Sequence, residues 1–292
     1  MLDGLASFLQ VLLLAIVQGM AELLPVSSSA HVVVAEKLMG LDPSAPAMTL
    51  LLVMLHSGTM CAVIVYFRKT WRDSYFRSGQ AAREFGVLVV LATAVTGAGG
   101  EILIQLIEKG ALRSSPAAEV EQLFGRLELI APALAAGGIL ILIAGLAGRR
   151  GKASLSRAAL DRKRAVLIGA AQGLCLPFRG FSRSGATIST GMLAGVDKEQ
   201  AERFSFALAV VLTPAAIGRE ALRLLKASHG AGRGALTAAL APSLLGAALA
   251  FLAGLVALRW LSRWLETGRW HLFGIYCLAA AAGVAALRLS GY

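Results

Sequence analysis

The sequence is short of charged residues, and this shortage disfavours a soluble fold. Only 15% of the 292 residues are charged, whereas a typical soluble domain carries roughly 25%. Because 57% of the residues are hydrophobic, a chain folded in water would expose a large apolar surface. The more suitable structural unit is the membrane span of about 20 apolar residues.

Cysteine is also scarce, and its placement argues against a disulfide framework. The three cysteines, Cys61, Cys175 and Cys277, lie in apolar runs, form no CxxC pair and are odd in number. We interpret them as small buried hydrophobic residues. The start of the sequence lacks the basic residues of a cleaved signal peptide, so we expect the first apolar run to remain in the mature protein.

Basic residues are not scarce, because they outnumber the acidic ones and give the chain a formal net charge of +11. Such a charge can indicate nucleic-acid binding, but here the basic residues fall in short loops between apolar runs. The positive-inside rule for membrane proteins predicts that placement. We therefore expect membrane lipids, and not nucleic acid, around this chain.

Apolar runs predict the fold class. Two apolar regions, 5–40 and 165–195, are interrupted by polar breaks, which is typical of re-entrant hairpins that enter and leave on one side. The prediction is an all-α polytopic integral membrane protein with six transmembrane helices and two re-entrant helical hairpins. The six uninterrupted runs that are long enough to span lie at 48–67, 86–107, 128–147, 204–225, 236–257 and 271–289.

The charges of the loops favour this topology. With both termini outside, the basic loops 68–83 and 148–164 become cytoplasmic, and the acidic loop 108–127 becomes external. If either hairpin were a full span, every later loop would change sides and the positive-inside rule would fail there.

The two halves of the chain resemble each other. AIVQGM at 15–20 matches GAAQGL at 169–174, and a proline, a serine-rich break and a helix of small residues follow each. Each half is a hairpin plus three spans, an odd number, so the second copy must be inverted. We predict a first inverted repeat at 1–147, a basic cytoplasmic linker at 148–164 and a second repeat at 165–292. Such repeats place a site near the bilayer midplane, where the breaks meet.

The first break carries polar side chains that are unusual at this depth. Gln18 and Glu22 are four residues apart and share one face of a helix that Pro25 ends. A buried carboxylate is costly in a membrane unless it is paired or functional. Helix capping alone would explain the serines, and a structural hydrogen bond would explain the histidine. Neither role explains why all these polar residues occur together. The next helix begins with Ser27, Ser28, Ser29 and His31.

The second break adds arginine to a similar arrangement. It opens onto a helix N-terminus, whose free N–H groups and partial positive charge bind anions. Arginine adds bidentate hydrogen bonding to phosphate oxygens. The simpler explanation, an arginine that extends to the membrane interface, does not account for the hydroxyls and glycines around it. The two breaks together predict a site for a polyanion. The second break holds Arg179, Gly180, Ser182, Arg183, Ser184, Gly185 and Thr187.

These motifs resemble those of a known family. Q-x-x-x-E-x-x-P-V-S-S-S-x-H at 18–31 and G-F-S-R-S-G-A-T-I-S at 180–189 are similar to the two motifs of the undecaprenyl-diphosphate phosphatase family, also called the bacitracin-resistance protein. FSFALAV at 204–210 resembles the stretch that follows in that family. The likeness runs over nearly the whole chain, with the spans in matching order.

The resemblance implies an activity and its setting. Members hydrolyse undecaprenyl diphosphate to the monophosphate and inorganic phosphate, which recycles the lipid carrier for peptidoglycan and other envelope polymers and is associated with bacitracin resistance. It also implies the bacterial cytoplasmic membrane, an active site open to the periplasm, and a divalent cation, magnesium or calcium, with Glu22 as the expected ligand. Candidate catalytic residues are Glu22, Ser27, Ser28, His31 and Arg183, and candidate substrate contacts are Gln18, Ser29, Arg179, Gly180, Ser182, Ser184 and Thr187.

Three positions depart from the common pattern of that family. Gln18 stands where many members have a second glutamate, Ala30 replaces a usual glycine, and Arg179 replaces the usual proline. Arg179 adds a cation and is expected to alter the turn beside Gly180.

Two mechanisms stay open from the sequence. Ser28, with His31 as its base, would attack the terminal phosphorus and form a covalent intermediate. Alternatively, Glu22 or His31 would activate a water molecule. His56, early in the first span, could approach the site, but we interpret it chiefly as a structural residue.

The rival function is a transporter or flippase of a polyprenyl diphosphate lipid. Inverted repeats and broken helices are also transporter architecture. A flippase needs cations for the anionic head group, but it has no need for the glutamate, histidine and serines beside them. Faces of small residues in the spans are compatible with a homodimer.

Overall fold

The computed structural model describes residues 2–41, 46–110, 125–150, 158–227 and 233–291. These residues form α-helices and short connections, with one isolated bridge between Ala158 and Val196. The all-α fold predicted from the sequence is therefore confirmed. The helices are α1 Leu2–Leu23, α2 Ser28–Leu38, α3 Pro46–Tyr75, α4 Gly79–Gly110, α5 Leu127–Arg150, α6 Arg162–Cys175, α7 Arg183–Leu193, α8 Lys198–Ala227, α9 Arg233–Glu266 and α10 Trp270–Leu289.

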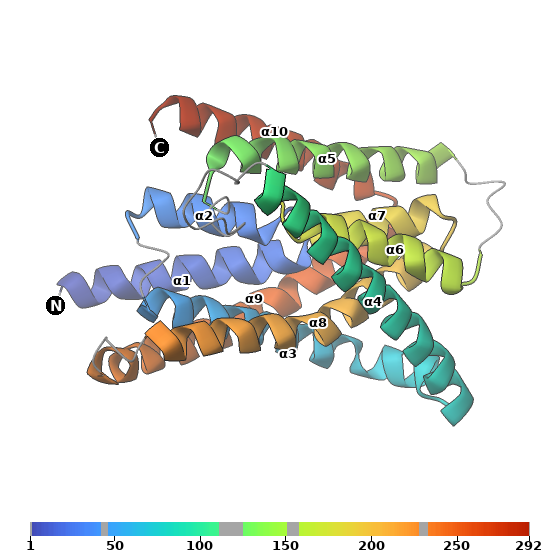
Figure 1. Ribbon diagram of the computed structural model, residues 1–292, viewed down its shortest axis with the longest axis horizontal. Coiled ribbons are helices and arrows are strands. Elements are labelled where there is room, and N and C mark those ends of the chain that lie inside the picture. The colour runs from blue at the N-terminus through green and yellow to red at the C-terminus, as the bar shows by residue number, and fades with distance from the viewer. Residues whose placement is uncertain (1, 42–45, 111–124, 151–157, 228–232, 292) are drawn as a thin grey trace.

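Two pairs of helices fold back on themselves at the expected breaks. α1 packs against α2, and α6 packs against α7. Pro25 and Pro177 each follow the first helix of a pair, where a residue without an N–H cannot continue the helical hydrogen bonding. Ser27 and Ser182 then cap the second helix, since each Oγ accepts the backbone N–H three residues on. Figure 1 shows the hairpins coming from opposite ends, with their turns near the centre of the molecule.

Long helices enclose the two hairpins. α4 packs on α6 and α9 packs on α1, while α3 packs along α9 and α5 along α10. The start of α1 and the end of α10 lie at one end of the molecule, and the α3–α4 turn lies at the other (Figure 1). The division into two inverted repeats, 1–147 and 165–292 with a linker at 148–164, stays a prediction.

Five of the described helical segments are long and apolar enough to cross a membrane, and they make this a polytopic membrane protein. α8 covers the predicted span 204–225 but is not one of the five, so the count of six spans stays a prediction. The five segments are Met48–Tyr75, Gly79–Gly110, Leu127–Gly148, Leu240–Glu266 and Trp270–Leu289.

The outer faces of the bundle are apolar, as a lipid-facing surface requires. Val90, Ile102 and Leu106 on α4, together with Leu252 and Val256 on α9, are all more than half exposed. Such an apolar surface is unfavourable in contact with water but not in contact with lipid hydrocarbon tails. The polar residues of the two breaks are consequently enclosed by helices whose apolar sides face outward.

Candidate active site

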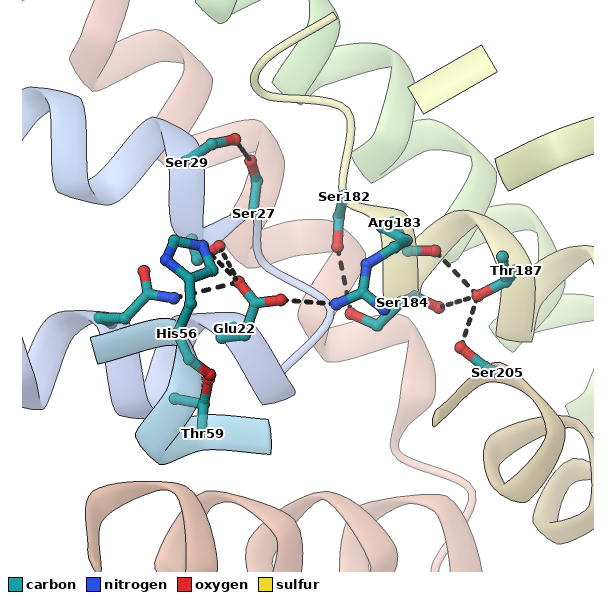
Figure 2. A network of polar contacts seen from close by, with 12 residues as sticks. Glu22, Ser27, Ser29, His56, Thr59, Ser182, Arg183, Ser184, Thr187 and Ser205 are labelled. Atoms are coloured by element: carbon teal, nitrogen blue, oxygen red, sulfur yellow. Dashed lines mark hydrogen bonds and ion pairs between the residues drawn. The ribbon is translucent and has the colours of Figure 1, made fainter. Parts of the chain in front are cut away.

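An ion pair joins the two breaks at the centre of the molecule. Arg183, the first residue of α7, donates from Nη2 to Oε1 of Glu22, near the end of α1, over 2.5 Å. The two side chains are 22% and 10% exposed, so the pair is largely withdrawn from solvent. Figure 2 shows Glu22 and Arg183 pointing toward each other from opposite hairpins. The structure thus brings together the carboxylate and the arginine that the two sequence motifs supply.

The second oxygen of Glu22 gathers the other polar groups of the first hairpin. Its Oε2 accepts hydrogen bonds from Ser28 Oγ at 2.6 Å and from Gln18 Nε2 at 3.2 Å. His56 of α3 places Nε2 3.8 Å from the same oxygen. Because His56 Nδ1 lies 2.9 Å from the carbonyl oxygen of Leu52, the neutral ring carries its hydrogen on Nδ1 and offers a lone pair at Nε2.

The turn before α2 is strained and tied to the second break. Ser27 has φ +69°, a value that L residues seldom adopt, and its Oγ lies 3.3 Å from Ser29 Oγ. Ser29 Oγ in turn accepts the N–H of Gly180 at 3.4 Å. Gly180 has φ +109°, and a Cβ there would lie 2.6 Å from the carbonyl oxygen of Ile130. Only glycine fits this crossing point.

The hydroxyls of the second break hold the first turn of α7 in place. Ser182 caps the helix, and Ser184 Oγ donates to the carbonyl oxygen of Leu24 at 3.3 Å. Thr187 Oγ1 lies 2.8 Å from the Arg183 carbonyl oxygen and 2.6 Å from Ser205 Oγ on α8. These contacts fix the backbone from which the Arg183 guanidinium reaches Glu22.

His31 is engaged away from Ser28. Its Nδ1 lies 2.8 Å from the carbonyl oxygen of Ser27, and its Nε2 lies 2.7 Å from Tyr276 Oη on α10. The described structure therefore pairs Ser28 with Glu22, and not with His31 as the covalent mechanism was expected to do. The catalytic role of His31 stays a prediction.

Arg179 lies in the exposed connection between α6 and α7. Its charge acts on the carboxylate of Glu36, an α2 residue that is 1% exposed. The role of Arg179 as a substrate contact stays a prediction.

Three residues of the site lie outside the sequence candidates. Ser205 belongs to the FSFALAV stretch, so its segment was noticed but its hydroxyl was not. His56 was interpreted as structural, although a polar ring in an apolar run was a usable signal. Tyr276 gave no signal, because tyrosine is common near membrane interfaces.

The donor atoms at Glu22 fit a divalent cation that is shared with a substrate. In the part of the chain that the structure describes, no three His, Cys, Asp or Glu side chains form a group that could hold a metal. Glu22, Ser28 and Gln18 do offer oxygen donors, which magnesium and calcium prefer, and magnesium usually takes one or two carboxylates together with substrate phosphates. The arrangement suits such a shared ion, with Glu22 as the protein ligand, and does not suit an all-protein metal centre.

Known proteins match this chain over almost its full length. Undecaprenyl-diphosphatase 2 of Acinetobacter baylyi is 55% identical over 284 residues, which are 96% of this chain and 97% of that protein. The undecaprenyl-diphosphatases of Korarchaeum cryptofilum and of a Nocardioides species are 33% and 31% identical, and they cover 96% and 98% of the chain and 98% of each relative. The family model described as bacitracin resistance protein BacA matches residues 11–283. With motifs, fold and site geometry in agreement, the chain belongs to the bacitracin resistance protein BacA family.

Proposed function

We propose that this protein hydrolyses undecaprenyl diphosphate to undecaprenyl phosphate and inorganic phosphate, and so recycles the lipid carrier for peptidoglycan and other envelope polymers. The relatives named for this activity support the proposal over nearly the whole chain. The observation that carries it is the Glu22–Arg183 pair, which lies between two helix starts inside a membrane protein. Resistance to bacitracin, which the family description names, is the associated property.

Arg183 and the starts of α2 and α7 are the anion-binding groups in this proposal. The Arg183 guanidinium donates to one carboxylate oxygen of Glu22. The oxygens of a diphosphate would compete for this guanidinium and bind it in a bidentate geometry. The first turns of α2 and α7 add N–H groups and partial positive charge. Phosphoryl transfer depends mainly on positioning and on charge stabilisation. A magnesium or calcium ion shared by Glu22 and the phosphates would supply further neutralisation.

Glu22 is the base in this proposal, because its Oε2 already accepts the Ser28 hydroxyl at 2.6 Å. In a covalent route, Ser28 passes its proton to Glu22 and attacks the terminal phosphorus. The bond from that phosphorus to the bridging oxygen breaks, and undecaprenyl phosphate leaves. Water then attacks the phosphorus of the phosphoserine, the bond from that phosphorus to Ser28 Oγ breaks, and inorganic phosphate leaves with the hydroxyl of the water. The other proton of the water goes to Ser28 Oγ, and Glu22 releases its proton to solvent. In the alternative route, Glu22 takes the proton of a water that attacks directly.

Rapid quenching separates the two routes. A phosphoserine trapped at Ser28 would establish the covalent route. A Ser28→Ala variant that keeps its activity, with no trapped phosphoserine in the parent protein, would establish direct attack by water.

We place the protein in the bacterial cytoplasmic membrane with the site open to the outside. The basic sequence segments 68–83 and 148–164 support this orientation, because segments rich in Lys and Arg between spans stay in the cytoplasm. The diphosphate head group would then be cleaved at the outer leaflet.

Phosphate release by the purified protein in detergent tests the proposed function. We expect release from undecaprenyl diphosphate with added magnesium or calcium, and its loss in EDTA. Glu22→Gln and Arg183→Ala should each lower kcat by on the order of a hundredfold or more, because each removes a group aimed at the transferred phosphoryl group. Glu84→Gln and Arg77→Ala are matched controls, since both side chains are exposed at the α3–α4 end.

The opposite outcome is equally clear. If folded protein binds undecaprenyl diphosphate but releases no phosphate under any of these conditions, the hydrolase proposal fails. A flippase of the same lipid then becomes the leading function.

A further inference from the structure

His31 and Tyr276 form a pair that the proposed chemistry does not use. Tyr276 Oη lies 2.7 Å from His31 Nε2, and the two rings are nearly parallel, with 12° between their planes and 5.6 Å between their centroids. The residues are 245 positions apart, on α2 and α10. A phenol at hydrogen-bond distance from one particular imidazole nitrogen is a directed contact, in addition to ring packing.

The partners of the two ring nitrogens decide where the hydrogen of a neutral His31 lies. The carbonyl oxygen of Ser27, 2.8 Å from Nδ1, can only accept, so Nδ1 must carry the hydrogen. Nε2 then has a lone pair, and the hydroxyl of Tyr276 must donate to it. This lone pair is the one that a base would use, and Tyr276 occupies it.

Tyr276 is held at this position by close packing of α10. Gly274 lies so close to α5 that a Cβ on it would be 2.7 Å from the carbonyl oxygen of Gly138. The next residue after Tyr276, Cys277, is buried, and its Sγ donates to the carbonyl oxygen of Pro25 at 3.4 Å. The backbone on either side of Tyr276 is thus fixed against α5 and against the first break.

We infer that Tyr276 is a positioning residue that holds His31 as the Nδ1–H tautomer, and that His31 in this form fixes the turn carrying Ser28. The inference rests on the proposed function, since it assigns a role within the same site. The chain of contacts runs from the Tyr276 hydroxyl through the imidazole to the Ser27 carbonyl. It supports the strained residue directly before Ser28, and it leaves Glu22 as the group that faces the Ser28 hydroxyl.

The simpler explanation is that Tyr276 is an interface anchor, a common role of tyrosine in membrane proteins. An anchor directs its hydroxyl to water or lipid head groups. Tyr276 directs its hydroxyl to His31, although nearly half of its surface is exposed. A Tyr276→Phe variant distinguishes the two explanations, because it keeps the ring and removes only the hydroxyl.

The first test is nitrogen NMR of the full-length protein labelled with ¹⁵N at histidine, with the His31 signals assigned from a His31→Gln variant. We expect Nδ1 to be protonated and Nε2 to be a hydrogen-bond acceptor near neutral pH. In Tyr276→Phe the Nε2 signal should shift. Tyr66→Phe should leave it unchanged, since the Tyr66 hydroxyl donates to Ser262 elsewhere in the bundle. A His31 that carries its hydrogen on Nε2, or a signal unchanged in Tyr276→Phe, would overturn the inference.

The second test is a double-mutant cycle on phosphate release. Tyr276→Phe should lower kcat by on the order of tenfold to a hundredfold, the size of loss known for the hydrogen-bond partners that orient metal-bound histidines, and Tyr66→Phe should not. Once His31→Gln is present, Tyr276→Phe should cost nothing further, because its effect passes through His31. Equal losses in both backgrounds would overturn the inference. The NMR result does not need activity, so a failure of the hydrolase proposal remains distinguishable.

Discussion

At Ser27, unfavourable backbone strain is opposed by a favourable helix cap. Its φ of +69° is unfavourable for any residue with a Cβ, by about 1–3 kcal/mol. Its Oγ also caps α2, a contact worth about 1 kcal/mol. Whether the residue stabilises the turn therefore depends on which of the two terms is removed.

Glycine and alanine at position 27 should have different effects on stability. Ser27→Ala loses the cap and keeps the strain, so we expect it to be less stable by about 1 kcal/mol. Ser27→Gly relieves the strain, and glycine is itself tolerated as a cap, so we expect it to be at least as stable as the parent. Thermal unfolding midpoints in one detergent make the comparison. An alanine variant as stable as the glycine variant would show that the positive φ is not a cost here.

At the scale of single residues, the sequence predicted which charged residues belong to the site better than it predicted which residues contact each other. Glu22 and Arg183 stood out because ionised groups are costly in a membrane and therefore need a reason to be there. The partner of His31 could not be found in the same way, because Tyr276 is 245 positions away and lies in a span without a motif. Local sequence specified that a histidine was present, and only the packing of α10 determined what it contacts.

At the scale of helices, each apolar run fell within a helix, but the runs did not predict where the helices end. The run 48–67 lies inside α3, Pro46–Tyr75, and the run 236–257 lies inside α9, Arg233–Glu266. An apolar run marks only the part of a helix that meets hydrocarbon. The helix continues into the charged interface, because its backbone hydrogen bonds are satisfied there as well.

Close packing of α3 against α9 depends on Gly58. A Cβ there would lie 2.1 Å from the carbonyl oxygen of Ala247, a backbone atom that cannot turn aside. We expect Gly58→Ala to destabilise the protein by about 1–3 kcal/mol, as overpacking usually does. Gly86→Ala on α4 is the matched control, because its Cβ would meet nothing within 4 Å. It should be neutral or stabilising by up to about 1 kcal/mol, from helix propensity. Equal unfolding midpoints would contradict close packing at Gly58.

At the scale of the whole molecule, the sequence predicted that the two breaks come together, and the structure places them in contact through Glu22 and Arg183. That prediction was possible because the membrane restricts where charged and polar residues can stand, both between the spans and in the breaks. The pairing of the outer helices, α3 with α9 and α5 with α10, was not predictable. Their contact faces are made of small and apolar residues, which carry no signal for one particular partner.

The membrane orientation of the whole chain gives the last prediction. α5 and α10 meet near one end of the molecule, where Arg288 Nε lies 3.7 Å from Glu128 Oε2. Gly125 and Ser290 are exposed and lie close to this pair in the sequence, so they share that end, whereas Ser78 is exposed at the α3–α4 end. Because the basic segment 68–83, which spans the α3–α4 turn, should be cytoplasmic, we expect Gly125 and Ser290 to face outward and Ser78 inward.

Cysteine labelling in intact cells measures this orientation. A membrane-impermeant maleimide should label Gly125→Cys and Ser290→Cys directly, and Ser78→Cys only after permeabilisation. The unmodified chain, treated in parallel, reports any labelling of its own three cysteines. If the second hairpin crossed the membrane fully, Ser290→Cys would be protected while Gly125→Cys was labelled, and the Arg288–Glu128 contact could not form. Labelling of Ser78→Cys alone would reverse the orientation and move the site to the cytoplasmic side, where a periplasmic diphosphate could not reach it.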